Sequence, residues 1–295
     1  MTLERTELDE GLPLIRNAPI RPRAWRELLE QDDVAAIQGP AGSLVLALQD
    51  GQLNLHYAFA DLEQMRLGFV GLFDQLKPEI DSFGAEYVRI DLVQLPNRNW
   101  VEPLLSEVDF VEFGEWLDMV YADLDPSRPP PEFPPGVTMR RGTAEDFDRI
   151  VDIEGAAYGD LADGETATRE RLEDAAWAGV MEQDGRVVAY AINGHVERAE
   201  GRVLSAAVDP DAWGQGLGAL VLAAAVFQLT ASEARRATVR VRPDVPQALR
   251  ITQALGFRPG PRGVEWRRPV DEQEIADRRQ QRRVGGVKAR FGKWR

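Results

Sequence analysis

The chain has 295 residues, of which 44% are hydrophobic, so it can bury the core of one large domain or of two ordinary ones. It has no cysteine, which excludes disulfides and thiolate chemistry, and two histidines are too few for a histidine-built metal site, so no metal is expected. The net charge of −14 disfavours nucleic acid as a partner. No apolar run is long enough to span a membrane and the first residues lack a signal-peptide pattern, which predicts a cytoplasmic protein.

Six prolines between Asp125 and Gly136 mark the clearest boundary along the chain. Prolines at this density favour extended polyproline geometry and exclude a helix interior, so residues 126–136 are predicted to be a semi-rigid linker. The predicted organisation is a first domain over residues 1–125, a second over 137–270 and a basic tail over 271–295.

The first domain is predicted to open with a hairpin, because Asp50-Gly51 is a strong two-residue turn signal between two apolar runs. Apolar periodicity predicts the remaining elements. In chain order the predicted elements are strands 43–48 and 52–59, helix 61–83, strand 87–93, helix 97–108 and strand 113–124.

The second domain begins with a strand and then a helix for which Thr143 is the predicted N-cap, with Asp146 in the first turn. A second hairpin turns at Asp184-Gly185, the same turn as in the first domain, and is part of a weak internal repeat. The predicted elements are strand 137–141, helix 143–158, helix 166–177, strands 179–183, 186–196 and 202–208, helix 216–232, strand 237–241, helix 246–255, and strands near 257 and over 264–268.

The segment that carries chemistry follows the strand ending at Val208. After Asp209-Pro210 come Gly214, Gly216 and Gly218, which open a long apolar helix. Glycines let backbone N–H groups approach a ligand, and a helix start adds unpaired donors, so the segment predicts an anion site suited to a diphosphate. A dinucleotide site and a helix start without ligand are the alternatives. The loop follows the third strand of an antiparallel series, whereas a dinucleotide site needs a parallel β-α-β unit.

These motifs resemble the GNAT N-acyltransferase superfamily, whose pattern is a strand ending Val-x-Pro followed by a Gly-x-Gly that opens a helix. Val208-Asp209-Pro210 and Gly216-Leu217-Gly218 match that pattern, and Leu255-Gly256-Phe257 matches a later segment. The resemblance implies an α+β fold of two tandem GNAT-like domains, each a mixed, mostly antiparallel sheet flanked by helices. The first domain resembles a degenerate copy without the cofactor loop, as in mycothiol synthase-like proteins.

The resemblance also implies acetyl-CoA as co-substrate, held in the gap where strand 203–208 separates from strand 237–241. Its diphosphate would bind the backbone of the glycine loop and its pantetheine arm the strand before the loop. The implied cofactor-binding residues are Ala206, Val208, Gly214, Gln215, Gly216, Leu217, Gly218 and Ala219. The sequence departs from the family at Trp213, where Arg or Gln is usual, at Val245, where Asn is common, and at Thr252, which replaces the tyrosine that often protonates the CoA thiolate.

Candidate catalytic residues on the acceptor side are Glu154, Tyr158 and Glu197. Glu154 and Tyr158 lie one turn apart on the helix that lines the acceptor cleft in the family, and Glu197 lies at a turn before the central strand. Each can equally be structural: a solvated carboxylate, a half-buried tyrosine or a hairpin end. Ser205, in the central strand, is expected to be a small packing residue.

The predicted function is transfer of an acetyl group from acetyl-CoA to an amine of a small molecule or peptide by direct attack. Two other classes stay open. The replacement at Thr252 favours a non-catalytic CoA-binding sensor. The tail residues 282–295 interleave basic side chains with Phe291 and Trp294, which fits a nucleic-acid-associated protein or a segment that docks on the acidic first half. A homodimer is also left open.

Overall fold

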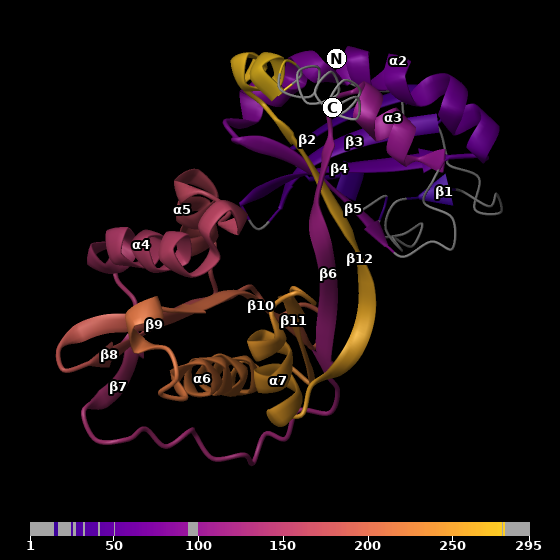
Figure 1. Ribbon diagram of the computed structural model, residues 1–295. Coiled ribbons are helices and arrows are strands. Elements are labelled where there is room, and N and C mark those ends of the chain that lie inside the picture. Colours follow the sequence, from indigo (N-terminus) through magenta and orange to yellow (C-terminus); the bar gives the residue numbers. More distant parts are fainter. Residues whose placement is uncertain are drawn as a thin grey trace, which may run out of the picture. The chain divides into compact units, whose positions relative to one another are not determined.

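The computed structural model describes residues 15–16, 25, 28–31, 33–40, 42–49, 51–93, 100–278 and 280, so that residues 281–295 of the predicted tail lie outside the described part. The chain divides into two compact units (Figure 1). Unit 1 comprises Met1–Phe113 and Val264–Arg295, and unit 2 comprises Gly114–Gly263. These limits differ from the predicted boundaries at 125, 137 and 270, because two long strands each contribute residues to both units.

Unit 1 is a sheet covered on one face by a 19-residue helix, α2 (Leu62–Ile80). The strands are β1 (Ile15–Arg16), β2 (Val34–Gly39), β3 (Gly42–Gln49), β4 (Gln52–Phe59), β5 (Tyr87–Val93) and the end of β12, in the order β2-β3-β4-β5-β12 with β1 beside β4. A shorter helix, α3 (Glu102–Glu107), follows β5. The rings of Phe69 and Phe73 stack in the core, which α2 fills with the apolar side chains that its periodicity predicted.

Unit 2 contains the strands β6 (Val111–Tyr121), β7 (Val137–Arg141), β8 (Trp177–Gln183), β9 (Arg186–Asn193), β10 (Glu200–Val208), β11 (Arg236–Val241) and the start of β12 (Arg258–Pro269). Their order is β6-β11-β10-β9-β8-β7, with β12 next to β6. All neighbouring pairs with printed register are antiparallel except β10 with β11, which are parallel. The mixed, mostly antiparallel sheet expected from the resemblance is confirmed.

Helices cover both faces of the unit 2 sheet. Helix α4 (Phe147–Tyr158) packs on β9 and β10 from one side, with α5 (Glu165–Glu173) beside it. Helix α6 (Leu217–Ala231) packs on the same strands from the other side, with α7 (Pro246–Ala254) beside it. Strand β10 is therefore sandwiched between helices at its centre.

Local signals in the sequence predicted most of these elements. Thr143 and Asp146 form the expected capping box before α4. The hairpin between β8 and β9 turns through Asp184 and Gly185 at φ of 52° and 78°, the left-handed geometry of a type I′ turn. Two predictions were wrong: Trp177 begins β8 instead of ending α5, and the two strands expected near the end of unit 2 are one continuous strand, β12.

Strand β6 belongs to the sheet of unit 2, although it precedes the proline-rich segment. Its residues 117–121 pair with β11, and Asp118 forms an ion pair with Arg240 across the two strands, 2.9 Å apart. The proline-rich segment therefore joins two strands of one unit, β6 and β7. Its residues Pro129 and Pro131 line a pocket together with Phe227 of α6.

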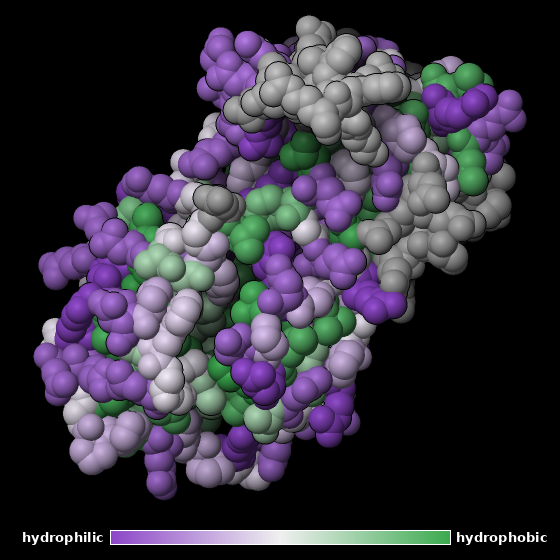
Figure 2. Space-filling model, in the orientation of Figure 1, coloured by the Kyte–Doolittle hydropathy of each residue, from purple (hydrophilic) through white to green (hydrophobic). Residues whose placement is uncertain are grey.

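Hydrophilic side chains cover most of the molecular face drawn in Figure 2. The exposed large apolar side chains among the described residues are Leu29, Leu62, Leu67 and Trp213, and of these only Trp213 lies beside the glycine loop. No helix of the described chain is long and apolar enough to span a membrane.

Candidate functional site

The glycine loop between β10 and α6 presents unpaired backbone donors. Gly214 and Gly216 have φ of 82° and 79°, and a Cβ added to either would meet only open space. Gly216 is the N-cap of α6, which has neither a side-chain cap nor an acidic residue in its first turn. Among the described residues, the amides of 214–218 find no hydrogen-bond acceptor, whereas Ala219 donates to Gly216 O. This is the arrangement that binds anions at a helix start.

The edge of β10 that leads into the loop is open toward β11. Parallel pairing with β11 stops at Val203↔Val239, although β10 continues to Val208. The Asp209 amide donates to Val188 O (2.8 Å), which fixes the alternation of the antiparallel β9–β10 pair. In such a pair, residues whose N–H and C=O bond to β9 alternate with residues whose N–H and C=O both point away from β9. Ala206 and Val208 belong to the residues that point away from β9. Their backbone groups face the gap beside β11.

Side chains cap both open carbonyls of this edge. Tyr158 Oη donates to Ala206 O at 2.7 Å, and Trp213 Nε1 donates to Val208 O at 2.8 Å. The Trp213 side chain is otherwise exposed, at 59%. Because a side-chain donor can rotate away, the carbonyls remain exchangeable with donors of a ligand.

Asp209 anchors the end of β10, a role that the sequence analysis missed. Its carboxylate accepts hydrogen bonds from the Asp211 amide (3.0 Å), from Arg186 (3.1 Å) and from Arg149, which also donates to Val187 O. The Asp211 amide, followed by Arg149, lowers the pKa of Asp209, so the carboxylate stays ionised. The Asp-Pro step that closes β10 was visible in the sequence, but its arginine partners come from α4 and β9.

Glu154 lies in a buried polar cluster beneath β10. Its side chain is buried, and its carboxylate lies 2.9 Å from Tyr190 Oη, 3.0 Å from Thr168 Oγ1 and 3.7 Å from Arg171 Nη1. Tyr190 Oη also lies 2.9 Å from Ser205 Oγ, and Ser205 is only partly buried. The structure thus brings Glu154 and Tyr158 to β10 from one helix, and it joins Tyr190 and Ser205 to Glu154 in one row of hydrogen bonds.

Glu197 lies apart from these residues. It begins the turn that leads into β10, where Arg198 and Ala199 have positive φ and Glu197 and Glu200 bond each other's backbone. From there to Ala206 the strand runs about 20 Å at about 3.3 Å per residue. Glu197 is exposed and shares no contact with the Glu154 cluster.

The hydroxyl of Thr252, at the position where the resemblance implies a tyrosine, bonds within its own helix. Its side chain is buried, and its hydroxyl lies 2.9 Å from Ala248 O and 3.0 Å from Leu249 O, in the preceding turn of α7. The hydroxyl is therefore engaged by its own helix. No group of three His, Cys, Asp or Glu suited to a metal occurs within the described residues.

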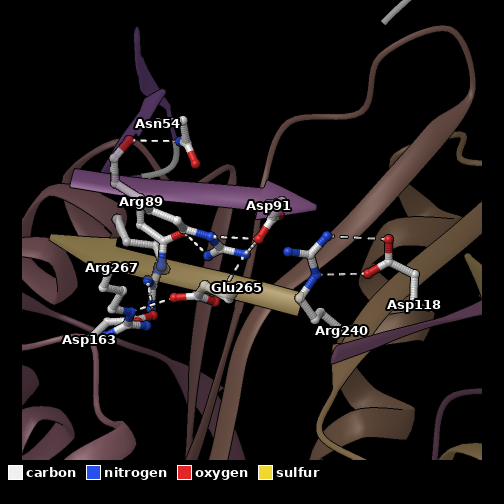
Figure 3. Close-up of polar contacts among 10 residues, drawn as sticks. Asn54, Arg89, Asp91, Asp118, Asp163, Arg240, Glu265 and Arg267 are labelled. Carbon is white, nitrogen blue, oxygen red and sulfur yellow. Dashed lines mark hydrogen bonds and ion pairs between the residues drawn. The ribbon is translucent and has the colours of Figure 1, made fainter. Parts of the chain in front are cut away.

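The corresponding region of unit 1 is closed. Strands β4 and β5 pair in parallel only at Leu53↔Val88 and Asn54↔Arg89, and the far end of the same β4 edge pairs with β1 through Ile15↔Phe59. Beside this pair, Arg89 lies between Asp91 (3.0 Å) and Glu265 (3.3 Å), which compensates its charge (Figure 3). Helix α2 follows without a glycine loop, and its N-cap Asp61 accepts a hydrogen bond from the Gln64 amide at 2.7 Å.

Solved structures share this architecture. The chain is similar to a GCN5-related N-acetyltransferase from Kribbella flavida (20% identity, 83% of this chain and 92% of that one, TM-score 0.57) and to one from Sphaerobacter thermophilus (17%, 90% and 97%, 0.56). It is also similar to a tandem GNAT protein from the clavulanic acid biosynthesis pathway (17%, 81% and 84%, 0.54). At these identities the likeness establishes the fold alone.

The sequence itself supplies the family. A search of curated proteins gave no match. Residues 145–257, which run from the start of α4 through the glycine loop to the end of α7, match the acetyltransferase (GNAT) family. Residues 145–257 therefore form an acetyltransferase (GNAT) domain within unit 2, and members of this family transfer an acyl group from acyl-CoA to an amine.

Proposed function

We propose that unit 2 transfers the acetyl group of acetyl-CoA to an amine of a small molecule or peptide by direct attack of the amine on the thioester. The observation that carries the proposal is the row of unpaired amides at 214–218, which lies at the end of a strand edge that is also open. Five donors at an uncapped helix start suit the diphosphate of CoA, and the β10 edge suits the amides of its pantetheine arm.

The acyl end of the arm would then lie beside Ala206. Its amide faces the open edge, where it can donate to the oxyanion that develops when the amine attacks. Tyr158 Oη donates to Ala206 O at 2.7 Å, so its hydroxyl lies close to this position. Burial, with the charge of Glu154 as a smaller cause, raises the pKa of Tyr158, so the phenol is protonated at neutral pH. We assign Tyr158 as the donor of the proton that the CoA thiolate takes up, in place of Thr252.

The test of the cofactor site is Gly216→Glu, read by calorimetric titration with acetyl-CoA. A carboxylate at the N-cap would repel the diphosphate and occupy the open space over the loop, so at least a 100-fold loss of affinity is expected. Gly84→Glu is the matched control, because Gly84 also has a left-handed φ (65°) and open space around it, but lies in unit 1. Equal affinity of the folded Gly216→Glu variant and the wild type would refute the site.

A second candidate function is a CoA-binding sensor without turnover. The engagement of the Thr252 hydroxyl by its own helix favours it, because the family's usual acid is missing. Release of free thiol from acetyl-CoA in the presence of primary amines distinguishes the two. A protein that binds acetyl-CoA and releases no thiol with any amine is the sensor.

A further inference from the structure

Glu154 is too deeply buried to meet an amine directly. The residue is 3% exposed, and its carboxylate contacts α5 through Thr168 and β9 through Tyr190. Yet a continuous row of polar atoms connects it to the surface of β10: Glu154 Oε2 to Tyr190 Oη (2.9 Å), and Tyr190 Oη to Ser205 Oγ (2.9 Å). The last atom belongs to a residue that is partly exposed.

The direction of these hydrogen bonds follows from the donors available. An ionised carboxylate only accepts, so the single hydrogen of the Tyr190 hydroxyl goes to Glu154. Tyr190 then offers only its lone pairs to Ser205, and Ser205 must donate to Tyr190. The lone pairs of Ser205 Oγ remain free to accept from a donor outside the protein. Both hydroxyl hydrogens therefore point toward Glu154, and the outermost oxygen, Ser205 Oγ, can accept a hydrogen bond from an N–H group.

An irregularity in β10 places this outer end beside the open edge. The register with β9 shifts between Val203 and Ser205, which is the signature of a β-bulge. Ser205 consequently lies on the α4 side of the sheet with Tyr190, next to Ala206, whose backbone faces the gap. A hydroxyl and an open amide from consecutive residues therefore flank one point on β10.

Resting on the acyltransfer proposed above, we propose that Ser205, Tyr190 and Glu154 form a proton relay that converts the bound ammonium of the acceptor into the attacking amine. The ammonium gives one proton to Ser205 Oγ, the Ser205 hydrogen passes to Tyr190 Oη, and the Tyr190 hydrogen passes to Glu154. The neutral nitrogen then attacks the thioester carbonyl and forms the C–N bond.

The remaining protons balance through Tyr158. As the C–S bond breaks, the thiolate takes the Tyr158 hydrogen, and Tyr158 takes the second proton of the former ammonium nitrogen. The products are the amide and CoA thiol, and Glu154 returns its proton to solvent after they leave. Ser205 is the member of the relay that touches the acceptor, whereas Tyr190 and Glu154 act through it.

The groups around Glu154 suit this role. Arg171 of α5 and the hydroxyls of Thr168 and Tyr190 stabilise the carboxylate, and Tyr158 of α4 and Asp163 act on the same cluster. Burial, followed by the charge of Glu154, raises the pKa of Tyr190 well above its ordinary value. Tyr190 therefore passes a hydrogen on without resting as a phenolate.

The experiment measures thiol release from acetyl-CoA against a panel of ethylamine, benzylamine and an alanine-initiated tripeptide, as kcat/KM between pH 6 and 9.5. Ser205→Ala, Tyr190→Phe and Glu154→Gln each interrupt the relay. Each variant is expected to lose about 100-fold at pH 7, the lower end of what a general base contributes. The loss should shrink as the pH approaches the pKa of the amine, because the free amine no longer needs deprotonation. Ser205→Thr keeps the hydroxyl and should restore activity.

Three outcomes separate the proposals. Wild-type rates at pH 7 in a folded Ser205→Ala variant would overturn the relay and leave the acyltransfer intact. A loss that is equal at every pH, or that accompanies weaker acetyl-CoA binding by titration, would assign the three residues a structural role and also overturn it. A wild type that binds acetyl-CoA but releases no thiol with any amine would remove the acyltransfer and the relay together.

Discussion

Each unit contains a pair of parallel strands that separate after a short paired stretch, β10 with β11 and β4 with β5, and the two open edges have different neighbours. In unit 2, β10 leaves β11 after Val203, and among the described residues the side chains of Tyr158 and Trp213 donate to the freed edge. In unit 1, β4 leaves β5 after Asn54, and the freed edge ends in pairing with β1. Strand β1 therefore pairs with the freed edge of β4 in unit 1, whereas rotatable side chains bond to the freed edge of β10 in unit 2.

The helices that follow these strands differ in the same sense. Helix α6 begins at Gly216 with free amides and no acidic residue in its first turn. Helix α2 begins at Asp61, whose carboxylate accepts from the Gln64 amide, and carries Glu63 in its first turn. In unit 1, strand β1 pairs with the β4 edge and the Asp61 carboxylate accepts from the start of α2. In unit 2, the amides at the start of α6 have no such carboxylate. On the function proposed above, we infer that the shared fold can hold a coenzyme only where these two positions are left free.

Tyr158 and Trp213 both donate to carbonyls of β10, and the largest effect on catalysis is expected from Tyr158→Phe. If Tyr158 is the proton donor, the variant loses 100-fold or more in kcat with the best amine, while acetyl-CoA affinity holds or rises slightly. Tyr121→Phe, another tyrosine of unit 2, is the control and should keep the wild-type rate. An unchanged kcat in Tyr158→Phe would exclude Tyr158 as the proton donor and leave it only the role of a hydrogen-bond donor to a β10 carbonyl, as Trp213 has.

Acid should affect the two units over different pH ranges. Burial lowers the pKa of His56 in unit 1 to about 4, against the opposing charge of Asp91. The unfolded chain binds a proton at His56 below about pH 6.5, whereas the folded chain binds it only near pH 4. The contribution of neutral His56 to the free energy of unfolding is therefore fully present above about pH 6.5 and is lost as the pH falls toward 4. In unit 2, a hydrogen bond from Arg140 lowers the pKa of Asp146 to about 2, so its contribution is lost only below about pH 4.

The measurement is urea unfolding followed by circular dichroism at pH 7 and pH 5. The free energy of unfolding should fall by about 1 to 2 kcal/mol between these values through His56. His56→Gln should remove most of that difference, and His195→Gln, which replaces the exposed second histidine, should leave it in place. The same pH dependence in both variants would exclude His56 as its source.

Asp61→Ala tests the carboxylate that unit 1 supplies to its own helix. Loss of the N-cap should lower the free energy of unfolding by about 1 kcal/mol, measured by denaturant titration. Acetyl-CoA should still bind once per chain with wild-type affinity, because the β4–β5 gap stays occupied by β1. A second binding event in calorimetry would show that the cap alone keeps unit 1 empty.

The smallest effect is expected from Trp213→Phe. Without the indole N–H, nothing in the free protein competes for Val208 O, so acetyl-CoA should bind 2- to 10-fold more tightly, the worth of about one hydrogen bond. Adenosine 3′-phosphate 5′-diphosphate, which has the diphosphate but no pantetheine arm, is the control ligand and should bind both proteins equally. Equal gains for the two ligands would point to the loop instead of the strand edge.

The sequence predicted those features that depend on near neighbours. Strands β4, β5 and β7 have the predicted limits, because alternating apolar residues and turn glycines lie within a few positions of each other. The open amides of the loop could be foreseen from Gly214 and Gly216 for the same reason. Features that depend on distant pairing were missed: the place of β6 beside β11, and the continuity of β12.

The polar cluster shows the same limit. Glu154 and Tyr158 could be placed on one helix, but the partner of Glu154 comes from β9, 36 residues away in sequence. Ser205 was expected to be a packing residue because no local signal announces the bulge that places it beside Tyr190. The residues of the proposed relay therefore emerge only when three separate elements are assembled.

The membership of β6 in unit 2 has a practical consequence for dissecting the protein. A fragment cut at the proline-rich segment, such as residues 137–270, would lack the strand that pairs with β11 from Ala237 to Val241. The unpaired backbone groups along β11 could then form strand pairs between copies of the fragment, which commonly leads to aggregation. A fragment meant to behave as a soluble catalytic piece should begin no later than Gly114.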